Sequence, residues 1–318
     1  MQHYRLALYH PKKAVNIRFL PVKYFTLIWA MKYILVLLSV LSLSSFSFAQ
    51  QNASGYKIYD VKNKKLNDLD QLVKAVKGID VVVFGEEHND SVGHLLEAEI
   101  LKKMILAYPG TALSMEMFST DVQPVINEYL SGMISEKNFI KEARAWNNYN
   151  DYKPLIESAK TNKVAVIAAN VATRYSNAVT FGGLQTLSEF PSASKAYLPP
   201  LPVDTATGRY HAKFLETLGG HDMGNMKIYQ TQNLWDASMA WSIATYTKAN
   251  PGKKVLQLNG RFHSDEKLGT VAQLKKYAPK LKVVNISCFA AADFDQPDWD
   301  KYQLLGDYII LTAATASK

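Results

Sequence analysis

The sequence has only one cysteine, Cys288, among its 318 residues. No intramolecular disulfide can form, so the fold has to be stabilised by its hydrophobic core rather than by cross-links. A cysteine at a leader cleavage site, where bacterial lipoproteins carry their lipid, is also missing. Cys288 lies in the apolar run VVNISCFAAA, and we expect it to be a small buried side chain.

Acidic residues are absent before residue 50, whereas six basic residues occur there. The formal net charge of +8 therefore falls to +2 for residues 50–318. Nucleic-acid binding needs a clustered basic face, so we do not expect a nucleic-acid partner. With 48% hydrophobic and 20% charged residues, the composition is typical of a globular protein with a sizeable core.

Apolar runs of membrane-spanning length, about 20 residues, are also lacking. The longest run falls in residues 31–49, MKYILVLLSVLSLSSFSFA, where Lys32 precedes it and residues 47–49 fit a small-x-small cleavage site. This pattern predicts a signal peptide and an exported, periplasmic or secreted protein. A signal anchor that stays in the membrane is the alternative. Residues 1–30 are unusually long and polar for such a start, and we interpret them as an upstream extension before a true initiator at Met31.

Residues 50–318 show no linker or repeat, which predicts one domain. Continuous apolar runs of β type indicate strands buried on both faces, and helical patterns lie between them. This alternation predicts an α/β fold, a mostly parallel central sheet flanked by helices. A helical lid segment, about 171–253, is expected between the third strand and the strand that ends at Asn259-Gly260. The predicted strands are Val81–Phe84, Ala112–Met115, Val164–Ala169, Val255–Leu258, Val283–Ile286 and Tyr308–Leu311.

Polar residues follow four of the predicted strands. The carboxyl ends of parallel strands share one edge of a sheet, where open α/β sheets bind ligands. We therefore expect these residues to form one site. They are Glu86 and His88 after the first strand, Glu116 after the second, Asn170 after the third, and Arg261 and His263 after the fourth.

Two of these segments have the pattern G-x-x-H, at residues 85–88 and 260–263. Glycine permits a sharp turn off the strand, which directs the histidine into the crevice. Neutral imidazoles beside a carboxylate suit a divalent metal, with His88, His263 and Glu116 as the candidate ligands. They equally suit an acid/base pair, and the third interpretation is hydrogen bonding within the loops.

Further polar residues follow the first strand. We interpret Glu87 and Asp90 as capping residues of the next helix, because its dipole favours acids in the first turn. His94 lies one and a half turns beyond His88, and the sequence leaves open whether it faces the crevice or the helix surface.

At this point the chain resembles the ChaN haem-binding proteins of the wider Tiki and erythromycin-esterase-like superfamily. The resemblance covers roughly residues 75–311, with its segments in the family's own order. The segments are FGEEHND, SMEMFSTDVQ, ARAWNNYNDYKPLIESAK, VIAANVATRY, LPPLP, QNLWDASMAWSI and NGRFHSD.

The resemblance implies a periplasmic or surface-exposed protein that binds haem in iron acquisition, forms a homodimer with stacked haems, and serves a haem-uptake receptor or transporter. It also implies an axial tyrosine, best matched by Tyr175. Phenolate suits ferric iron, and Arg174 beside it would favour the phenolate or bind a haem propionate. Ala172 and Thr173 depart from the family pattern at this point. Asn170, Arg261 and His221 are further candidate haem contacts.

Three functions follow from these observations. The first is haem binding in iron acquisition. The second is a metal-dependent hydrolase that uses His88, Glu86, Glu116 and His263, with the metal lowering the pKa of a bound water. The third is a non-catalytic docking protein in which the polar residues only order the loops.

Overall fold

The computed structural model describes residues 55–221 and 223–313, which all belong to one compact unit. The predicted upstream extension, 1–30, and the predicted signal peptide, 31–49, lie outside the described residues. Of the helices that the described residues form, none combines the length and the hydropathy that a membrane crossing needs.

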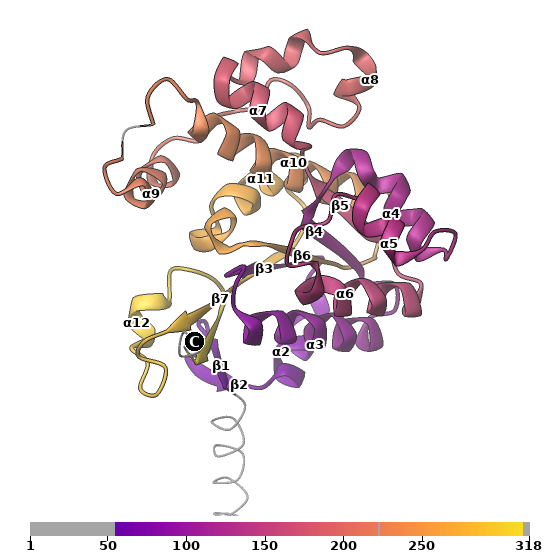
Figure 1. Cartoon of the computed structure of the whole chain (residues 1–318). Coiled ribbons are helices and arrows are strands. Elements are labelled where there is room, and N and C mark those ends of the chain that lie inside the picture. Colours follow the sequence, from indigo (N-terminus) through magenta and orange to yellow (C-terminus); the bar gives the residue numbers. More distant parts are fainter. Residues whose placement is uncertain (1–54, 222, 314–318) are drawn as a thin grey trace, which may run out of the picture. The chain divides into compact units, whose positions relative to one another are not determined.

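The centre of the fold is an eight-stranded sheet with the order β2-β1-β8-β7-β3-β6-β4-β5 (Figure 1). Its strands from β8 to β5 in this order are all parallel, which confirms the predicted α/β class. The strands are β1 (Tyr56–Asp60), β2 (Lys65–Asn67), β3 (Val81–Glu86), β4 (Ala112–Ser119), β5 (Val166–Asn170), β6 (Val255–Gly260), β7 (Val283–Ala291) and β8 (Tyr308–Ala313).

Two strands at one edge, β1 and β2, were not predicted. β1 pairs antiparallel with β8, and β2 pairs antiparallel with β1. Their residues are partly exposed and partly charged, and β2 has only three residues. Neither strand therefore carries the continuous apolar run that marks a strand buried on both faces.

Helices cover both faces of the sheet because successive β3 side chains point to opposite sides. Val82 and Phe84 pack in a cluster with α2 (Leu69–Ala75), α3 (Ser91–Ala107) and α6 (Tyr149–Asn162). Val81 and Val83 pack with α10 (Ile228–Ala249) and α11 (Gly269–Tyr277). The first face also receives α4 (Gln123–Leu130) and α5 (Glu136–Glu142). The short helices are η1 (Val76–Gly78), η2 (Thr120–Val122), η3 (Leu184–Glu189), η4 (Arg261–His263), η5 (Asp265–Lys267) and α12 (Trp299–Tyr302).

The predicted lid segment divides into two parts. Residues 171–227, here called the outer lid, carry α7 (Thr173–Gly182), α8 (Ser192–Lys195) and α9 (Arg209–Leu218), which extend away from the sheet (Figure 1). The remainder, α10, is not a lid: Ala240 and Ile243 pack directly on the sheet residues of the second cluster. The lid prediction was therefore too long by one core helix.

The strand order determines where the site lies. From β3 the chain runs to β4 and β5, returns to insert β6 between β3 and β4, and then crosses to β7 on the other side of β3. The carboxyl ends of β3, β6 and β4 are therefore neighbours at a point where the order reverses. Such switch points are the usual ligand sites of parallel sheets.

Candidate functional site

Glu116 occupies the point where β4 separates from β6. The pairing of these strands ends at Met115 and Leu258, and the register of β4 shifts after Met115. Gly260 consequently has no β4 backbone partner, and its N–H donates to Glu116 Oε2 at 2.8 Å. The carboxylate thus replaces a strand hydrogen bond, which satisfies one oxygen of a side chain that is only 7% exposed.

The glycines of both G-x-x-H segments are required by close packing. A Cβ on Gly85 would lie 2.6 Å from Ser264 Oγ, and a Cβ on Gly260 would lie 2.8 Å from His88 Nε2. Each glycine therefore lets the other segment approach its strand end. The two segments pack against each other at the ends of adjacent strands.

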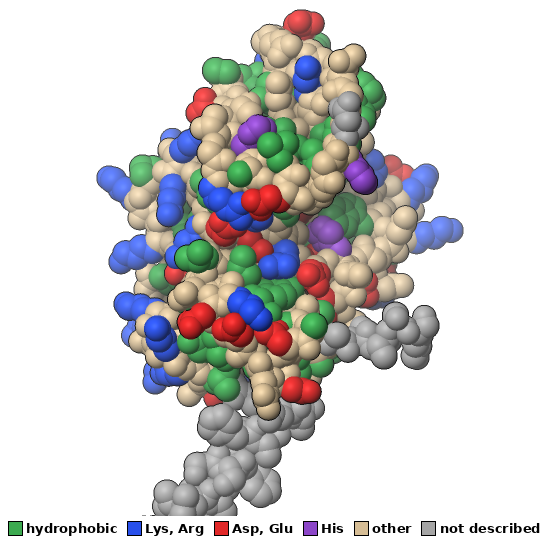
Figure 2. Space-filling view, turned by 90° about the vertical axis from the view of Figure 1, so that its left-hand side faces the viewer, with side chains coloured by type: hydrophobic (Ala, Val, Ile, Leu, Met, Phe, Trp, Pro, Cys, Tyr) green, Lys and Arg blue, Asp and Glu red, His purple; other side chains and the backbone are tan. Residues whose placement is uncertain are grey.

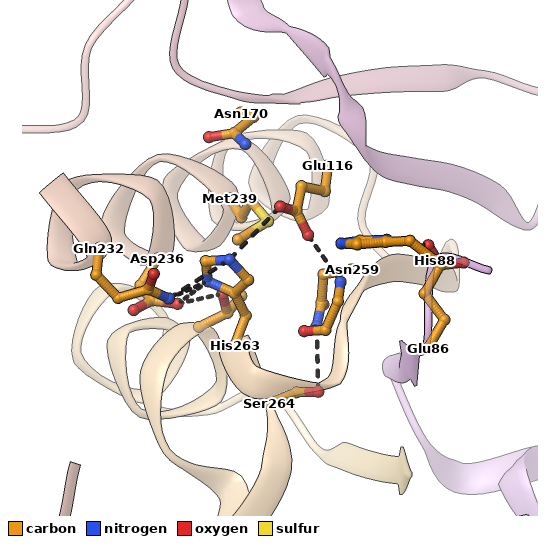
Figure 3. A network of polar contacts seen from close by, with 12 residues as sticks. Glu86, His88, Glu116, Asn170, Gln232, Asp236, Met239, Asn259, His263 and Ser264 are labelled. Carbon is orange, nitrogen blue, oxygen red and sulfur yellow. Dashed lines mark hydrogen bonds and ion pairs between the residues drawn. The ribbon is translucent and has the colours of Figure 1, made fainter. Parts of the chain in front are cut away.

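His88 is half exposed and is oriented by a buried carboxylate. Its Nδ1 lies 2.7 Å from Glu86 Oε1, and the same oxygen accepts a hydrogen bond from the Tyr152 hydroxyl at 2.6 Å. The ring also meets Trp146 edge-on, with centroids 5.2 Å apart. The hydrogen bond to Glu86 is the main cause that raises the pKa of His88, and Glu116 adds to it. Nε2 is left to face Glu116 (Figure 3).

His263 is buried between two carboxylates. Its Nδ1 lies 2.8 Å from Asp236 Oδ1, and its Nε2 lies 3.5 Å from Glu116 Oε1. Burial opposes the charged ring, but Glu116 and Asp236 outweigh burial and raise the pKa of His263 to about 9. His263 is therefore an imidazolium at neutral pH, with both N–H groups directed at carboxylates.

Asp236 and Gln232 were missed by the sequence analysis. Both lie on the buried face of α10, and Gln232 Nε2 lies 2.9 Å from His263 Nδ1. Tyr210 donates to Asp236 Oδ2 at 2.5 Å, and Thr270 donates to Oδ1 at 3.0 Å. A signal did exist: two polar residues four apart fall on one face of a helix, and in α10 that face is buried.

Glu116 lies between the two imidazoles, and each imidazole has a carboxylate of its own behind it (Figure 3). We call His88, Glu116 and His263 the strand-end cluster. The arrangement suits proton transfer, because one ring offers a lone pair and the other an acidic N–H.

The same geometry bears on the predicted metal set of His88, His263 and Glu116. His263 Nε2 lies 3.5 Å from Glu116 Oε1, and His88 comes from the adjacent strand end. Among the described residues, the group whose donor atoms lie within 4.8 Å of one another is instead Glu86, His94 and Glu97.

Asn170 ends β5 and Arg261 follows β6, and each residue makes contacts of its own. Asn170 lies close to Glu116 in Figure 3, and its Oδ1 accepts a hydrogen bond from Val171 N at 2.8 Å. Arg261 pairs with Asp265 at 2.8 Å and stacks over Phe289, 4.0 Å from the ring centroid. Arg261 is thus held toward β7.

Tyr175 and Arg174 lie on α7, in the outer lid. Tyr175 is only 1% exposed, and its ring meets Phe190 with centroids 5.1 Å apart. Its hydroxyl accepts a hydrogen bond from Arg174 at 3.0 Å, and Arg174 also pairs with Asp121. His221 is exposed in the loop between α9 and α10. These residues are therefore separate in the fold from the strand-end cluster.

The interpretation of the capping residues was half right. Asp90 is the N-cap of α3 and accepts from Val92 N at 3.0 Å and Gly93 N at 3.1 Å. Glu87 is not a cap: it accepts from Ala290 N at 3.3 Å and lies 3.6 Å from Arg261. Glu87 therefore binds a backbone N–H of β7 rather than the N-terminus of α3, where the helix dipole would have favoured it.

Figure 2 presents the face that carries acidic and basic side chains intermixed across its middle. A histidine lies at a hollow in this face, with hydrophobic side chains next to it. This part of the surface therefore carries basic, acidic and apolar side chains together, rather than a patch of a single type.

The chain matches the family described as haem-binding uptake, Tiki superfamily, ChaN, over residues 72–274. Among curated proteins, none matches the sequence. A solved structure described as cofacial haem binding to ChaN of Campylobacter jejuni is similar in fold, with a TM-score of 0.60 and 15% identity over 81% of this chain and 97% of that one. An erythromycin esterase mutant in its open conformation matches with a TM-score of 0.46 and 11% identity over 83% and 84% of the two chains.

Replacing Gly260 with alanine should displace the His88 ring, because the new Cβ would lie 2.8 Å from Nε2. The hydrogen bond to Glu86 would weaken, so the pKa of His88 should fall toward its ordinary value of about 6.5. NMR titration of the histidine ring measures this change. Gly78→Ala is the control, since a Cβ there meets no atom within 4 Å. An unchanged pKa in Gly260→Ala would contradict the packing role.

The stability of the protein should fall as the pH rises from about 6.5 to 9. The folded-state pKa of His263, about 9, exceeds the ordinary value, so its imidazolium stabilises the fold below pH 6.5 and this contribution is lost as pH rises through 9. The loss is on the order of 3 kcal/mol. The free energy of unfolding, measured with urea at several pH values, should depend less steeply on pH in His263→Gln than in the unmodified protein. In His211→Gln this pH dependence should be unchanged. Equal slopes in all three proteins would rule out this role of His263.

Proposed function

Because the chain belongs to the ChaN family of haem-binding uptake proteins in the Tiki superfamily, we propose that it binds haem. The observation that carries this proposal is the family match over residues 72–274. That range contains both G-x-x-H segments, the outer lid and α10. The similarity therefore extends over every element that builds the candidate site.

Exposed apolar side chains of the outer lid support haem binding there. Phe181 at the end of α7 is 67% exposed, and Met226 in the loop before α10 is 40% exposed. A backbone hydrogen bond of 2.7 Å from Lys227 N to Thr180 O joins these two segments. A flat porphyrin gains binding free energy by covering such apolar surface. His221, in the same loop as Met226, is our proposed second haem contact.

Tyr175 is our proposed iron ligand. In the haem-free protein its hydroxyl is engaged by Arg174, so coordination requires Arg174 to move aside. The Arg174 side chain is 50% exposed, and its movement therefore buries no charge. Once released, its guanidinium would be suited to a haem propionate, which it can bind with two parallel hydrogen bonds.

We place this haem binding in iron acquisition outside the cytoplasm, either in the periplasm or after secretion. The support for export is the sequence pattern at residues 31–49, which predicts a signal peptide. We also propose, from the sequence resemblance alone, a homodimer with haems between its subunits and a haem-uptake receptor or transporter as the recipient of haem.

Titration of the purified protein with haemin should give a saturable shift of the Soret band. Tyr175→Phe should weaken binding by at least about tenfold, because even outer contacts of a bound metal contribute that much. Tyr246→Phe, at the far end of α10, is the matched control. A flat titration of the unmodified protein would overturn haem binding. Equal binding by Tyr175→Phe and the unmodified protein would overturn only the ligand assignment.

A second candidate function, hydrolysis, is favoured by one observation: each imidazole of the strand-end cluster is oriented by its own carboxylate. In this function His88 accepts a proton from water through Nε2. The Nε2–H of the His263 imidazolium, whose contact with Glu116 is long at 3.5 Å, donates to the attacked carbonyl oxygen as negative charge develops on it, and the ester C–O bond then breaks to release the alkoxide or phenoxide. Glu116 holds the two rings in place.

Hydrolysis of an activated ester, p-nitrophenyl acetate, by the haem-free protein tests this candidate. His88→Gln should lower the rate by about 10²- to 10⁴-fold, the usual contribution of a positioned base. The rate should rise as His88 loses its proton and decline near pH 9, where His263 loses its own. His211→Gln should match the unmodified protein. A His88→Gln rate that equals that of the unmodified protein would exclude the hydrolase.

A further inference from the structure

A second polar cluster lies behind His88, inside the fold. Glu86 comes from the end of β3, and His94 and Glu97 come from the first two turns of α3. These side chains are 2%, 5% and 0% exposed, respectively. One donor atom from each lies within 4.8 Å of the others. This group shares no residue with the strand-end cluster and contacts it through the pair of Glu86 and His88.

The tautomer of His94 is determined by its surroundings. Its Nε2 lies 3.1 Å from the backbone carbonyl oxygen of His88, which can only accept, so Nε2 carries a hydrogen. In the neutral ring, Nδ1 then presents a lone pair. This Nδ1 lies 3.2 Å from Glu97 Oε2 and 3.5 Å from Glu86 Oε2. Metal-binding histidines commonly donate their second ring N–H to a carbonyl in this way.

The two carboxylates also direct free lone pairs into this space. Glu86 uses Oε1 for both His88 and Tyr152, whereas no N–H or hydroxyl group of the described part of the chain donates to its Oε2. Glu97 Oε1 likewise receives no such hydrogen bond there. A hydrogen bond joins Glu86 and Glu97 when one of these two carboxyl groups carries a proton. Buried carboxylate oxygens without a partner are costly, since they have lost their water and gained nothing in exchange.

The charge of the cluster is unbalanced. Two buried carboxylates, Glu86 and Glu97, approach the same His94 Nδ1 atom at 3.5 and 3.2 Å. The group therefore needs a positive charge at its centre. A proton on His94 Nδ1, a proton shared by Glu86 and Glu97, or a metal ion can supply it.

We propose that Glu86, His94 and Glu97 bind one divalent transition-metal ion, such as Zn²⁺ or Mn²⁺. Donor atoms about 2.1 Å from a common ion at tetrahedral angles lie about 3.4 Å apart, close to the two distances from His94 Nδ1. One imidazole nitrogen with carboxylate oxygens suits these borderline ions better than Mg²⁺, which prefers oxygen ligands and retained water.

The site would act on the strand-end cluster through Glu86. One oxygen of Glu86 would bind the ion, while the other holds His88 Nδ1 and the Tyr152 hydroxyl. The metal would thereby fix the orientation of His88 without touching anything bound to the outer lid. The site is independent of haem binding and differs from a metal site formed by His88, His263 and Glu116.

The experiment uses the full chain, free of haem. The protein is stripped of metal with a chelator, equilibrated with ZnCl₂ or MnCl₂ and dialysed, and its metal content is then measured. The unmodified protein should retain near-stoichiometric metal. Glu97→Gln should lower metal affinity by at least about tenfold. Glu99→Gln is the matched control, because Glu99 lies on the same helix but is half exposed and pairs with Lys102. Glu116→Gln, which alters only the strand-end cluster, should also retain the metal.

Two results would overturn the proposal. One is an unmodified protein that retains no more metal than Glu97→Gln. In that case a proton shared by the two glutamates accounts for the cluster, and Glu97→Gln should have the thermal stability of the unmodified protein, because glutamine imitates a protonated glutamate. The other is metal loss in Glu116→Gln but not in Glu97→Gln.

X-ray absorption at the zinc edge of the unmodified protein gives a readout that does not depend on the folding of any variant. One imidazole with oxygen ligands supports the proposed site, and two imidazoles contradict it.

Discussion

Glu86 is the residue on which the rest of the site depends. A carboxylate at the buried end of a central strand is stable only if its oxygens find partners, and this one connects otherwise separate parts of the protein. Its Oε1 holds His88 and Tyr152, which come from the strand-end loop and from α6. Its Oε2 faces His94 on α3. Two helices and the first G-x-x-H segment are thereby held in register around one charged group.

Glu116 has a similar role on β4, which β6 separates from β3. By accepting the Gly260 N–H, it compensates for the point at which β4 separates from β6. The pairing of β4 with β6 ends at Met115 and Leu258, which leaves the Gly260 N–H for the carboxylate. The buried acid is therefore both a consequence of the break in the sheet and the group that makes the break tolerable.

The parallel strands and their polar ends could be predicted because they are local in sequence. A buried parallel strand needs a continuous apolar run; Glu116 stands directly after one such run, and His263 lies five positions after the end of another. The contributions of Asp236 and Glu97 could not be predicted in this way. Both lie inside helices, and only the packing of α10 and α3 shows which helix face meets the site. The edge strands were missed because partial exposure removes the apolar signal.

The haem and hydrolase proposals use different surfaces of the same fold. Tyr175 and Arg174 lie on α7, whereas the two oriented imidazoles lie at the sheet edge. Family membership supports the first proposal and local geometry supports the second. One polypeptide can carry both features, since a residue that orders a loop in one relative can serve chemistry in another.

The helix α10 links these surfaces mechanically. It is continuous over 22 residues, a length of about 33 Å. Its C-terminal half is anchored in the sheet core, while Leu234 and Ala237 in its first half belong to the cluster that includes Tyr175. The same half carries Asp236, which holds His263. A rearrangement of the outer lid that tilts this half of α10 would move Asp236 relative to His263. A ligand bound at the outer lid would thereby change the proton affinity of His263 at the sheet edge.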